Sequence, residues 1–213
     1  MKMIRNAFLV LVLIVATNIC TAAQGGIMSA FKSAPAGVFP MIDESARLDM
    51  IDYYNSPTNV GATNVFSGRS RITEIVPGSM RIAMTSASRY QLVELPVAAD
   101  TLVAVITTIL TPAPDSKIAV YGSDWTIIPT EKVFKTPEMK DWLTDIGKKN
   151  KKVVESLVPF MLVGYDFDPS TMTLTLVNNM QSYLSEEVYD KVKPYLHEKL
   201  AYRWNGKKFE TVK

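Results

Sequence analysis

Cysteine and histidine are almost absent from this chain of 213 residues, which has one of each. The single cysteine, Cys20, lies near the N-terminus, so the chain beyond it has no thiol for disulfides, catalysis or metal binding. The single histidine, His197, stands beside Glu198 and Lys199 near the end of an expected helix. A histidine in that place is typically exposed and stabilised by the helix dipole. We therefore expect no metal site, no catalytic residue of these types and no cofactor.

A long apolar run is also lacking. The run at residues 7–16 is short of the about 20 apolar residues that a membrane helix needs. It follows Lys2 and Arg5 and precedes the small residues Ala22 and Ala23, which is the order of a secretory signal peptide. We interpret residues 1–23 as a signal peptide that is cleaved before Gln24, with no transmembrane segment afterwards. The protein is then extracytoplasmic, either periplasmic or secreted.

Two other readings of the N-terminus stay open. The apolar run is either removed or kept as an uncleaved anchor, although the polar residues that follow it favour removal. Cys20 would carry a lipid if it were a lipoprotein cysteine, and the protein would then be a lipid-anchored envelope protein. The bulky Ile19 directly before Cys20 fits that reading poorly, since small residues are expected there.

Net charge is missing from the part of the chain that remains after cleavage. Lys2 and Arg5 belong to the signal, and the other 21 basic residues balance the 21 acidic ones, all of which lie beyond residue 24. A neutral domain has no general electrostatic affinity for nucleic acid or anionic lipid. About 190 residues are enough for one domain with its own core.

Motifs of the common enzyme classes are absent as well. The sequence has no nucleophile elbow, phosphate-binding glycine loop, dinucleotide fingerprint or zinc-protease motif. Ser29 and Lys32 have the spacing of a lysine-activated serine but lie among small residues without the companion motifs. Asp166 and Asp168 resemble the start of a calcium loop, yet the glycine and glutamate that complete such a loop are missing. We expect a hairpin turn there instead.

The patterns that are present predict an α+β domain. Residues 24–42 are rich in glycine and proline and read as a partly ordered N-terminal arm, and residues 43–213 read as a single domain. Asp43 caps a helix that is expected to bury Leu48 and Ile51. Residues 70–130 have strand periodicity, and residues 101–110 are apolar enough to form a central strand buried on both faces.

The second half of the chain alternates helices with hairpins. Thr136 and Pro137 open an amphipathic helix that extends to residue 157, where Gly147 is a point of weakness. A hairpin over residues 160–177 and a helix from Ser185 follow, and Asn205-Gly206 predicts a final type I′ hairpin. The fold class is therefore an antiparallel β-sheet of about seven to nine strands with two or three amphipathic helices packed against it.

Three segments carry a resemblance to a known family. They are residues 47–54 (RLDMIDYY), 115–125 (DSKIAVYGSDW) and 202–209 (YRWNGKKF). Together they resemble an uncharacterised family of exported proteins, a domain of unknown function, from Bacteroidales. The resemblance covers most of the chain after the signal. It implies an envelope or secreted protein of a Gram-negative anaerobe, and it implies no activity and no site.

The residues that we regard as candidates for ligand binding are Asp115, Tyr121, Asp124 and Trp125. They combine carboxylates with aromatic rings in one turn-rich segment, a combination that suits a sugar or a peptide, although such residues are also ordinary in turns and strands. The chain then reads as a non-catalytic binding or accessory protein of the cell envelope, whose partner is an envelope protein, a peptide or a glycan. The alternative is a carboxylate-dependent extracytoplasmic hydrolase that acts on a glycan or peptide through Asp115 and Asp124.

Cleavage of the signal is directly testable. We expect mass spectrometry of the protein purified from its native host to give an N-terminus at Gln24, because the short apolar run and the small residues after it suit signal peptidase. A mature protein that still begins at Met1 contradicts this expectation. A lipid on Cys20 replaces it with an anchored protein.

Overall fold

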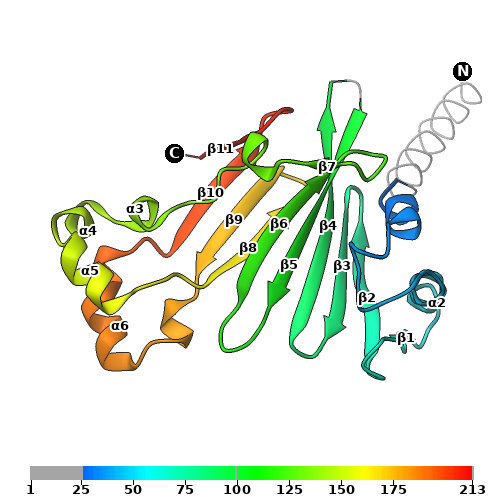
Figure 1. The fold of residues 1–213 in the computed structure, drawn as a ribbon, viewed down its shortest axis with the longest axis horizontal. Coiled ribbons are helices and arrows are strands. Elements are labelled where there is room, and N and C mark those ends of the chain that lie inside the picture. The colour runs from blue at the N-terminus through cyan, green and yellow to red at the C-terminus, as the bar shows by residue number, and fades with distance from the viewer. Residues whose placement is uncertain (1–25, 99, 213) are drawn as a thin grey trace, which may run out of the picture.

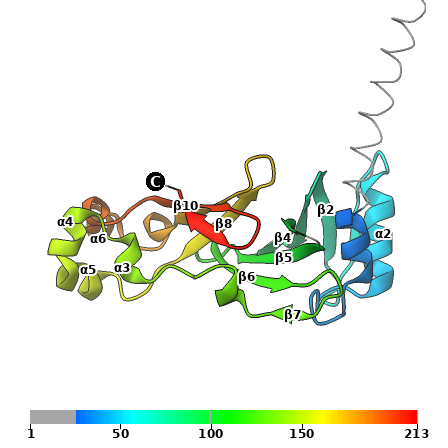
Figure 2. The same ribbon diagram turned by 90° about the horizontal axis from the view of Figure 1, so that it is seen from above.

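The computed structural model describes residues 26–98 and 100–212, so the predicted signal peptide, its cleavage site and Cys20 lie outside the described residues. Two antiparallel sheets, one of seven strands and one of four, occupy the middle of an elongated molecule (Figures 1 and 2). Helices lie at both ends of the molecule. The α+β class with antiparallel sheets is confirmed, and the strands are divided between two sheets. In the described part of the chain, no helix is long and apolar enough to cross a membrane.

The first sheet is a meander in which each strand pairs with the next one along the chain. Tight turns make this order, as at Gly78, whose positive φ of 76° closes the predicted turn after Pro77. The strands are β1 (Ala62–Thr63), β2 (Arg69–Val76), β3 (Ser79–Thr85), β4 (Ser88–Val97), β5 (Asp100–Ile109), β6 (Asp115–Tyr121) and β7 (Ile127–Ile128).

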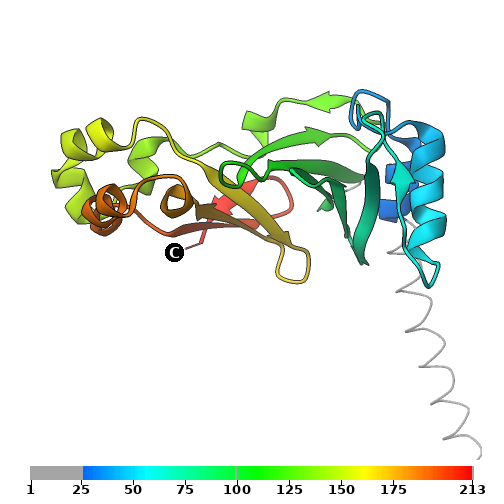
Figure 3. The same cartoon turned by 90° about the horizontal axis from the view of Figure 1, so that it is seen from below.

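Both faces of the first sheet are covered. Strand β5 is buried on both faces, as its apolar run predicts, although β4 holds the middle position in the strand order. On one face, Met80, Ile82 and Leu92 pack with the helix at residues 26–33 and with helix α2 (Glu44–Tyr54). The opposite face packs against the second sheet. Figure 3 shows the two helices on one side of the strands.

The segment expected to be a partly ordered arm is part of this core. Residues 26–33 are helical, and Ile27 and Phe31 are fully buried at helical spacing. The glycines and prolines that suggested an arm lie before Ile27 and after Phe31 in the sequence, with Gly26 as the first helical residue that the structure describes. In the sequence, two apolar residues four positions apart are too few to predict a helix.

Helix α2 begins after Asp43 as predicted, with the Asp43 carboxylate accepting a hydrogen bond from the Ala46 N–H at 2.8 Å. Ile51 is buried as predicted, but Leu48 is 43% exposed while Arg47 is only 4% exposed. The Arg47 guanidinium donates to the carbonyls of Lys32 and Ala34, at 3.3 and 2.8 Å. These carbonyls end the helix at residues 26–33, so Arg47 turns inward to cap it.

The second sheet has the order β11-β10-β9-β8. The Asp168 carboxylate closes its first hairpin by accepting bonds from Ser170 and Thr171, as expected for a turn. At the second hairpin only Gly206 has positive φ, so the predicted type I′ turn is replaced by a loop that the Asn205 side chain holds. The strands are β8 (Val163–Asp168), β9 (Thr173–Asn178), β10 (Lys199–Trp204) and β11 (Phe209–Thr211).

Strand β8 meets the first sheet through its backbone. It is the edge strand of the second sheet, and the N–H groups of Val163, Tyr165 and Phe167 donate to side chains of the first sheet. The acceptors are Asp115, Ser116 and Gln91, at distances of 3.1, 2.9 and 3.1 Å in the same order. Backbone donors of an edge strand point along the plane of their sheet. The edge of the second sheet therefore stands against the face of the first.

The single helix predicted for residues 136–157 is wrong. The segment forms three short helices, α3 (Met139–Trp142), α4 (Asp145–Lys149) and α5 (Lys151–Leu157). Tyr195 accounts for the first break: its carbonyl accepts from the Thr144 N–H at 2.9 Å and lies too close to Gly147 for a Cβ there. The second break is at Asn150, which ends α4 and begins α5. Trp142 and Val154 are buried, as their spacing predicts.

The last helix ends at its proline. Helix α6 (Glu186–Val192) passes into a 3-10 turn, η3 (Lys193–Tyr195), because Pro194 cannot donate the backbone bond that continues an α-helix. Val192 and Leu196 remain in the core. Two more 3-10 turns are present: η1 (Thr130–Lys132) precedes α3, and η2 (Met180–Ser182) precedes α6.

The division of the helix gives a test by urea unfolding. Trp142→Ala should lower the free energy of unfolding by about 3 to 5 kcal/mol, because the side chain is only 1% exposed. Val153→Ala should lower it by less than about 1 kcal/mol, because Val153 lies in the same segment but is 47% exposed. Equal losses from the two substitutions would mean that the three helices are packed differently.

Candidate functional site

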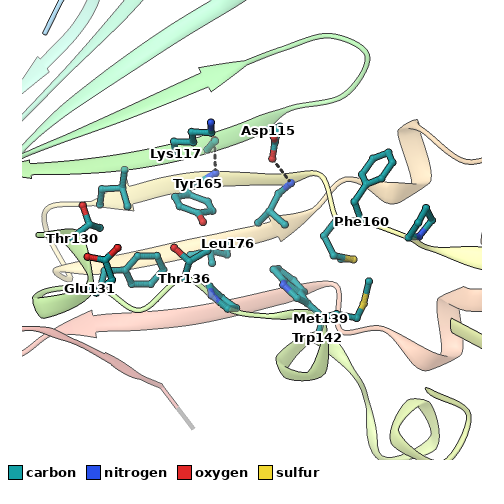
Figure 4. Close-up of a pocket in the computed structure, with 17 residues that line it drawn as sticks. Asp115, Lys117, Thr130, Glu131, Thr136, Met139, Trp142, Phe160, Tyr165 and Leu176 are labelled. Carbon is teal, nitrogen blue, oxygen red and sulfur yellow. Dashed lines mark hydrogen bonds between the residues drawn. The ribbon is translucent and has the colours of Figure 1, made fainter. Parts of the chain in front are cut away.

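A cavity of about 680 Å³ opens where the two sheets and the helical end of the molecule meet. Figure 4 shows strands β6 and β8 and helix α3 around it. Strand β6 contributes Asp115 to Ile118, and β8 contributes Val163 and Tyr165. The edge-to-face contact of β8 creates this space, because it holds the second sheet at an angle to the first rather than flat upon it.

The wall of the cavity is a rigid aromatic cluster. Phe134 makes edge-on contacts with three rings, and its ring centroid lies 5.9 Å from Tyr165, 5.3 Å from Tyr202 and 5.9 Å from Phe209. Phe134 and Trp142 are almost completely buried, at 2% and 1% exposure. Because their rings are fixed by packing and have almost no accessible surface, they form the rigid base of the cavity beneath its more exposed lining.

The rim carries an exposed aromatic pair. Phe160 lines the cavity and is 45% exposed, and its ring lies 5.3 Å from that of Tyr183, which is 44% exposed. The two rings are tilted by 54° to each other, so each leaves part of its own apolar surface open to a ligand at the cavity.

The charged residues of the cavity are Asp115, Lys117 and Glu131. Figure 4 shows Asp115 and Glu131 at different ends of the cavity, with Tyr165 between them. The Asp115 carboxylate also accepts the Val163 N–H at 3.1 Å, so one of its oxygens is held by the backbone of β8. Asp115 and Lys117 are two residues apart on β6 and thus point to the same side of the strand.

Tyr165 is the buried polar group of the site. Burial raises the pKa of its phenol to about 12, the hydrogen bond with Thr136 lowers it, and the negative charge of Asp115 raises it further. The phenol is therefore neutral throughout the physiological range. It presents a hydroxyl group, not a charge, to the cavity.

The four residues predicted to bind a ligand do not come together. Asp115 lines the cavity, while Tyr121 lies at the other end of the same strand. Tyr121 and Trp125 pack against each other with their centroids 5.3 Å apart, and Trp125 is 8% exposed and donates to the Ser33 hydroxyl at 3.2 Å. This pair belongs to the core between the first sheet and the N-terminal helices.

Asp124 has a local role in the turn before β7. Its carboxylate accepts the backbone N–H of Thr126 at 2.9 Å and the Thr126 hydroxyl at 2.8 Å. These two bonds lower the pKa of Asp124. Sequence reasoning missed the other residues of the cavity, above all Glu131, Phe160 and Tyr165. No pattern in the sequence set these residues apart, because they come from separate segments of the chain.

The two aspartates that resemble a calcium loop are engaged in other contacts. Asp166 forms an ion pair with Arg81 at 2.6 Å. The Asp168 carboxylate accepts hydrogen bonds within its own turn, and these bonds, above all the one from the Ser170 hydroxyl, lower the pKa of Asp168. In the described residues, no group of three or more His, Cys, Asp or Glu side chains is placed to hold a metal ion.

The buried phenol of Tyr165 predicts a pH dependence. Its pKa is raised from 10.0 to about 12, so the unfolded chain loses this proton first, and stability falls as the pH rises from about 10 to about 12. Two pKa units correspond to at most about 2 to 3 kcal/mol. Tyr165→Phe should therefore make the free energy of unfolding less sensitive to pH in this range. An identical alkaline slope for the variant would contradict the burial of the phenol.

Comparison with known proteins adds a family and a fold. No curated protein sequence matches the chain. A solved structure, described as a domain of an uncharacterized protein from Porphyromonas gingivalis W83, matches with a TM-score of 0.72 and 19% sequence identity over 88% of this chain and 98% of that one. This likeness shows the fold, and its source belongs to the Bacteroidales, as the sequence resemblance implied. The family model described as "Protein of unknown function (DUF3256)" matches residues 20–209, and the chain belongs to that family.

Proposed function

We propose that the protein is an exported, non-catalytic binding protein of the cell envelope and that its ligand occupies the cavity between the two sheets. The observation that carries this proposal is the cavity itself, with its rigid aromatic wall, its exposed aromatic rim and its separated charges. Ligand sites of small molecules have volumes of about 300 to 1,000 Å³ and combine an apolar lining with a few polar groups. The cavity of about 680 Å³ has these properties.

The lining indicates the class of ligand. The exposed ring of Phe160 suits a flat or aliphatic group, and the buried Phe134 keeps the base of the cavity rigid. The two carboxylates exceed the single Lys117 in charge, and they favour hydroxyl or amino groups that donate hydrogen bonds. Short peptides and glycan fragments provide both kinds of group, and both are available in a cell envelope.

The arrangement of carboxylates favours binding over hydrolysis. An acid–base or nucleophilic mechanism with two carboxylates needs both groups about 5 to 10 Å apart, facing one bond of the substrate. Asp115 begins β6, whereas Asp124 lies beyond the other end of that strand and is satisfied within its own turn. Asp115 and Glu131 share the cavity but lie at different ends of it. Asp115 also has the structural task of holding β8.

Export is the second part of the proposal. It is supported by the charged and apolar N-terminal segment and by the lack of cysteine after Cys20. A domain without thiols is indifferent to the redox state of its compartment, which suits a periplasmic or secreted protein.

Tryptophan fluorescence tests the binding proposal, because Trp142 lines the cavity. Soluble peptidoglycan fragments carry both a sugar and a peptide, and we expect them to change the emission in a saturable way. Phe160→Ala should raise the dissociation constant about tenfold, since stacking and apolar contact at such a rim are worth about 1 kcal/mol or more. Separate titrations with the free sugar and the free peptide then identify the part that is recognised.

A matched control separates the cavity from the rest of the surface. Phe66 is 72% exposed and lies on the first sheet's side of the molecule, outside the residues that line this cavity. Phe66→Ala should leave the dissociation constant unchanged. Saturable binding that both variants retain would place the ligand elsewhere. Release of the sugar or peptide as a cleaved product would support the hydrolase instead.

A further inference from the structure

The face of the first sheet that receives β8 also extends over strands β2, β3 and β4. The strand register places Arg71 opposite Ala83 and Ala83 opposite Arg89, so the three residues form one row across these strands. Residues directly opposite in an antiparallel sheet point to the same face. Neighbouring strands are about 4.8 Å apart, so the two arginines stand about 10 Å apart at their Cα atoms, on either side of a small side chain.

In the part of the chain that the structure describes, Arg71 and Arg89 have no ion pair that would balance their charges, unlike their neighbour Arg81. Arg81, which points to the same face from β3, pairs with Glu74 at 2.8 Å and with Asp166 at 2.6 Å. Within residues 26–98 and 100–212, no side-chain carboxylate lies within ion-pair distance of Arg71 or Arg89, although every Asp and Glu of the chain falls in these ranges. Both arginines are exposed. The row therefore carries two uncompensated positive charges.

A cavity of about 240 Å³ lies beside Arg89 on this face. Its charged lining residues are Arg81 and Arg89, and no carboxylate lines it. Its other polar lining residues are hydroxyl and amide side chains, among them Thr85, Ser88 and Thr108. This is the opposite of the large cavity, where carboxylates outnumber the one lysine. Tyr165 lines both cavities, so β8 separates them.

The hydroxyl groups have protons to donate. Thr85 and Ser88 share one hydrogen bond of 2.8 Å between their oxygens, and the Thr85 oxygen also accepts the Ala87 N–H. Two hydroxyls have two protons, and only one is used between them. Thr108 and Ser116 form a second pair at 2.8 Å, in which the Ser116 oxygen also accepts from Tyr165. The Thr85–Ser88 pair, whose two members line the cavity, therefore keeps a donor that the described contacts do not use, and Thr108 of the second pair also lines the cavity.

We propose that this cavity is a second binding site, which takes a single oxyanion such as a carboxylate or a phosphate group. A guanidinium fork and hydroxyl donors match the oxygens of either group, and the absence of a lining carboxylate removes the repulsion that would oppose an anion. The volume is below that of a site for a whole drug-sized ligand and suits a small anion or the anionic end of a larger one. Arg71 adds long-range attraction from the other side of Ala83.

Titration of the protein by NMR tests the site, with inorganic phosphate and acetate as separate probes in low-salt buffer. One of the two anions should shift the amide signals of residues 85–89 in a saturable way, and the anion with the lower dissociation constant identifies the oxyanion. Arg89→Gln should raise that constant at least tenfold. Arg203→Gln, which removes an exposed arginine from the second sheet, should leave it unchanged. Equal constants for the two variants, or no saturable shift with either anion, would overturn the proposal.

A second variant distinguishes a loss of anion binding from a loss of folding. Ala83→Glu places a carboxylate between Arg71 and Arg89, where it occupies the position of the anion. We expect this variant to lose anion binding and, at the same time, to unfold at a higher urea concentration than the wild-type protein, because it neutralises the two like charges. A lower unfolding midpoint together with unchanged anion binding would show that the row is not an anion site.

Discussion

The fold depends on how the free edge of strand β8 is satisfied. An edge strand that is removed from water needs partners for its backbone N–H groups. Asp115, Ser116 and Gln91 provide them, and Gln91 also donates to the Phe167 carbonyl at 2.7 Å. Gln91 and Ser116 are themselves buried, at 5% and 7% exposure, so leaving any of these groups unpaired costs about 1 to 3 kcal/mol. The polar side chains therefore fix both the position and the register of the second sheet.

This contact also explains why two cavities of opposite charge lie so close together. Side chains that meet an edge strand hold the sheets at an angle, which leaves space on both sides of β8. On one side, Asp115 and Glu131 give the large cavity a negative character. On the other side, Arg89 gives the small cavity a positive one, since Arg81 is already paired with Glu74 and Asp166. The strand acts as the partition, and its Tyr165 contributes to both walls.

The helices show where local sequence gives way to tertiary contact. Met139, Trp142 and Val154 have the spacing of one continuous helix, and each remains at least partly buried. The chain nevertheless leaves the helix before Thr144, because the Tyr195 carbonyl accepts the Thr144 N–H, and the same backbone lies too close to Gly147 for any side chain there. Gly147 was visible in the sequence as a weak point of the helix. Its close neighbour, 48 positions along the chain, was not.

The sequence by itself determined the elements that rest on local chemistry: the meander with its turn at Gly78, the cap at Asp43, the Asp168 hairpin and the doubly buried strand β5. Turn geometry, capping and apolar periodicity act over a few residues and can be read along the chain. The tertiary structure alone decided which residues share a cavity, because Asp115, Phe160 and Tyr165 come from segments with no common pattern. It also decided that Tyr121 and Trp125 serve the core, since whether an aromatic ring is buried or exposed depends on what packs against it.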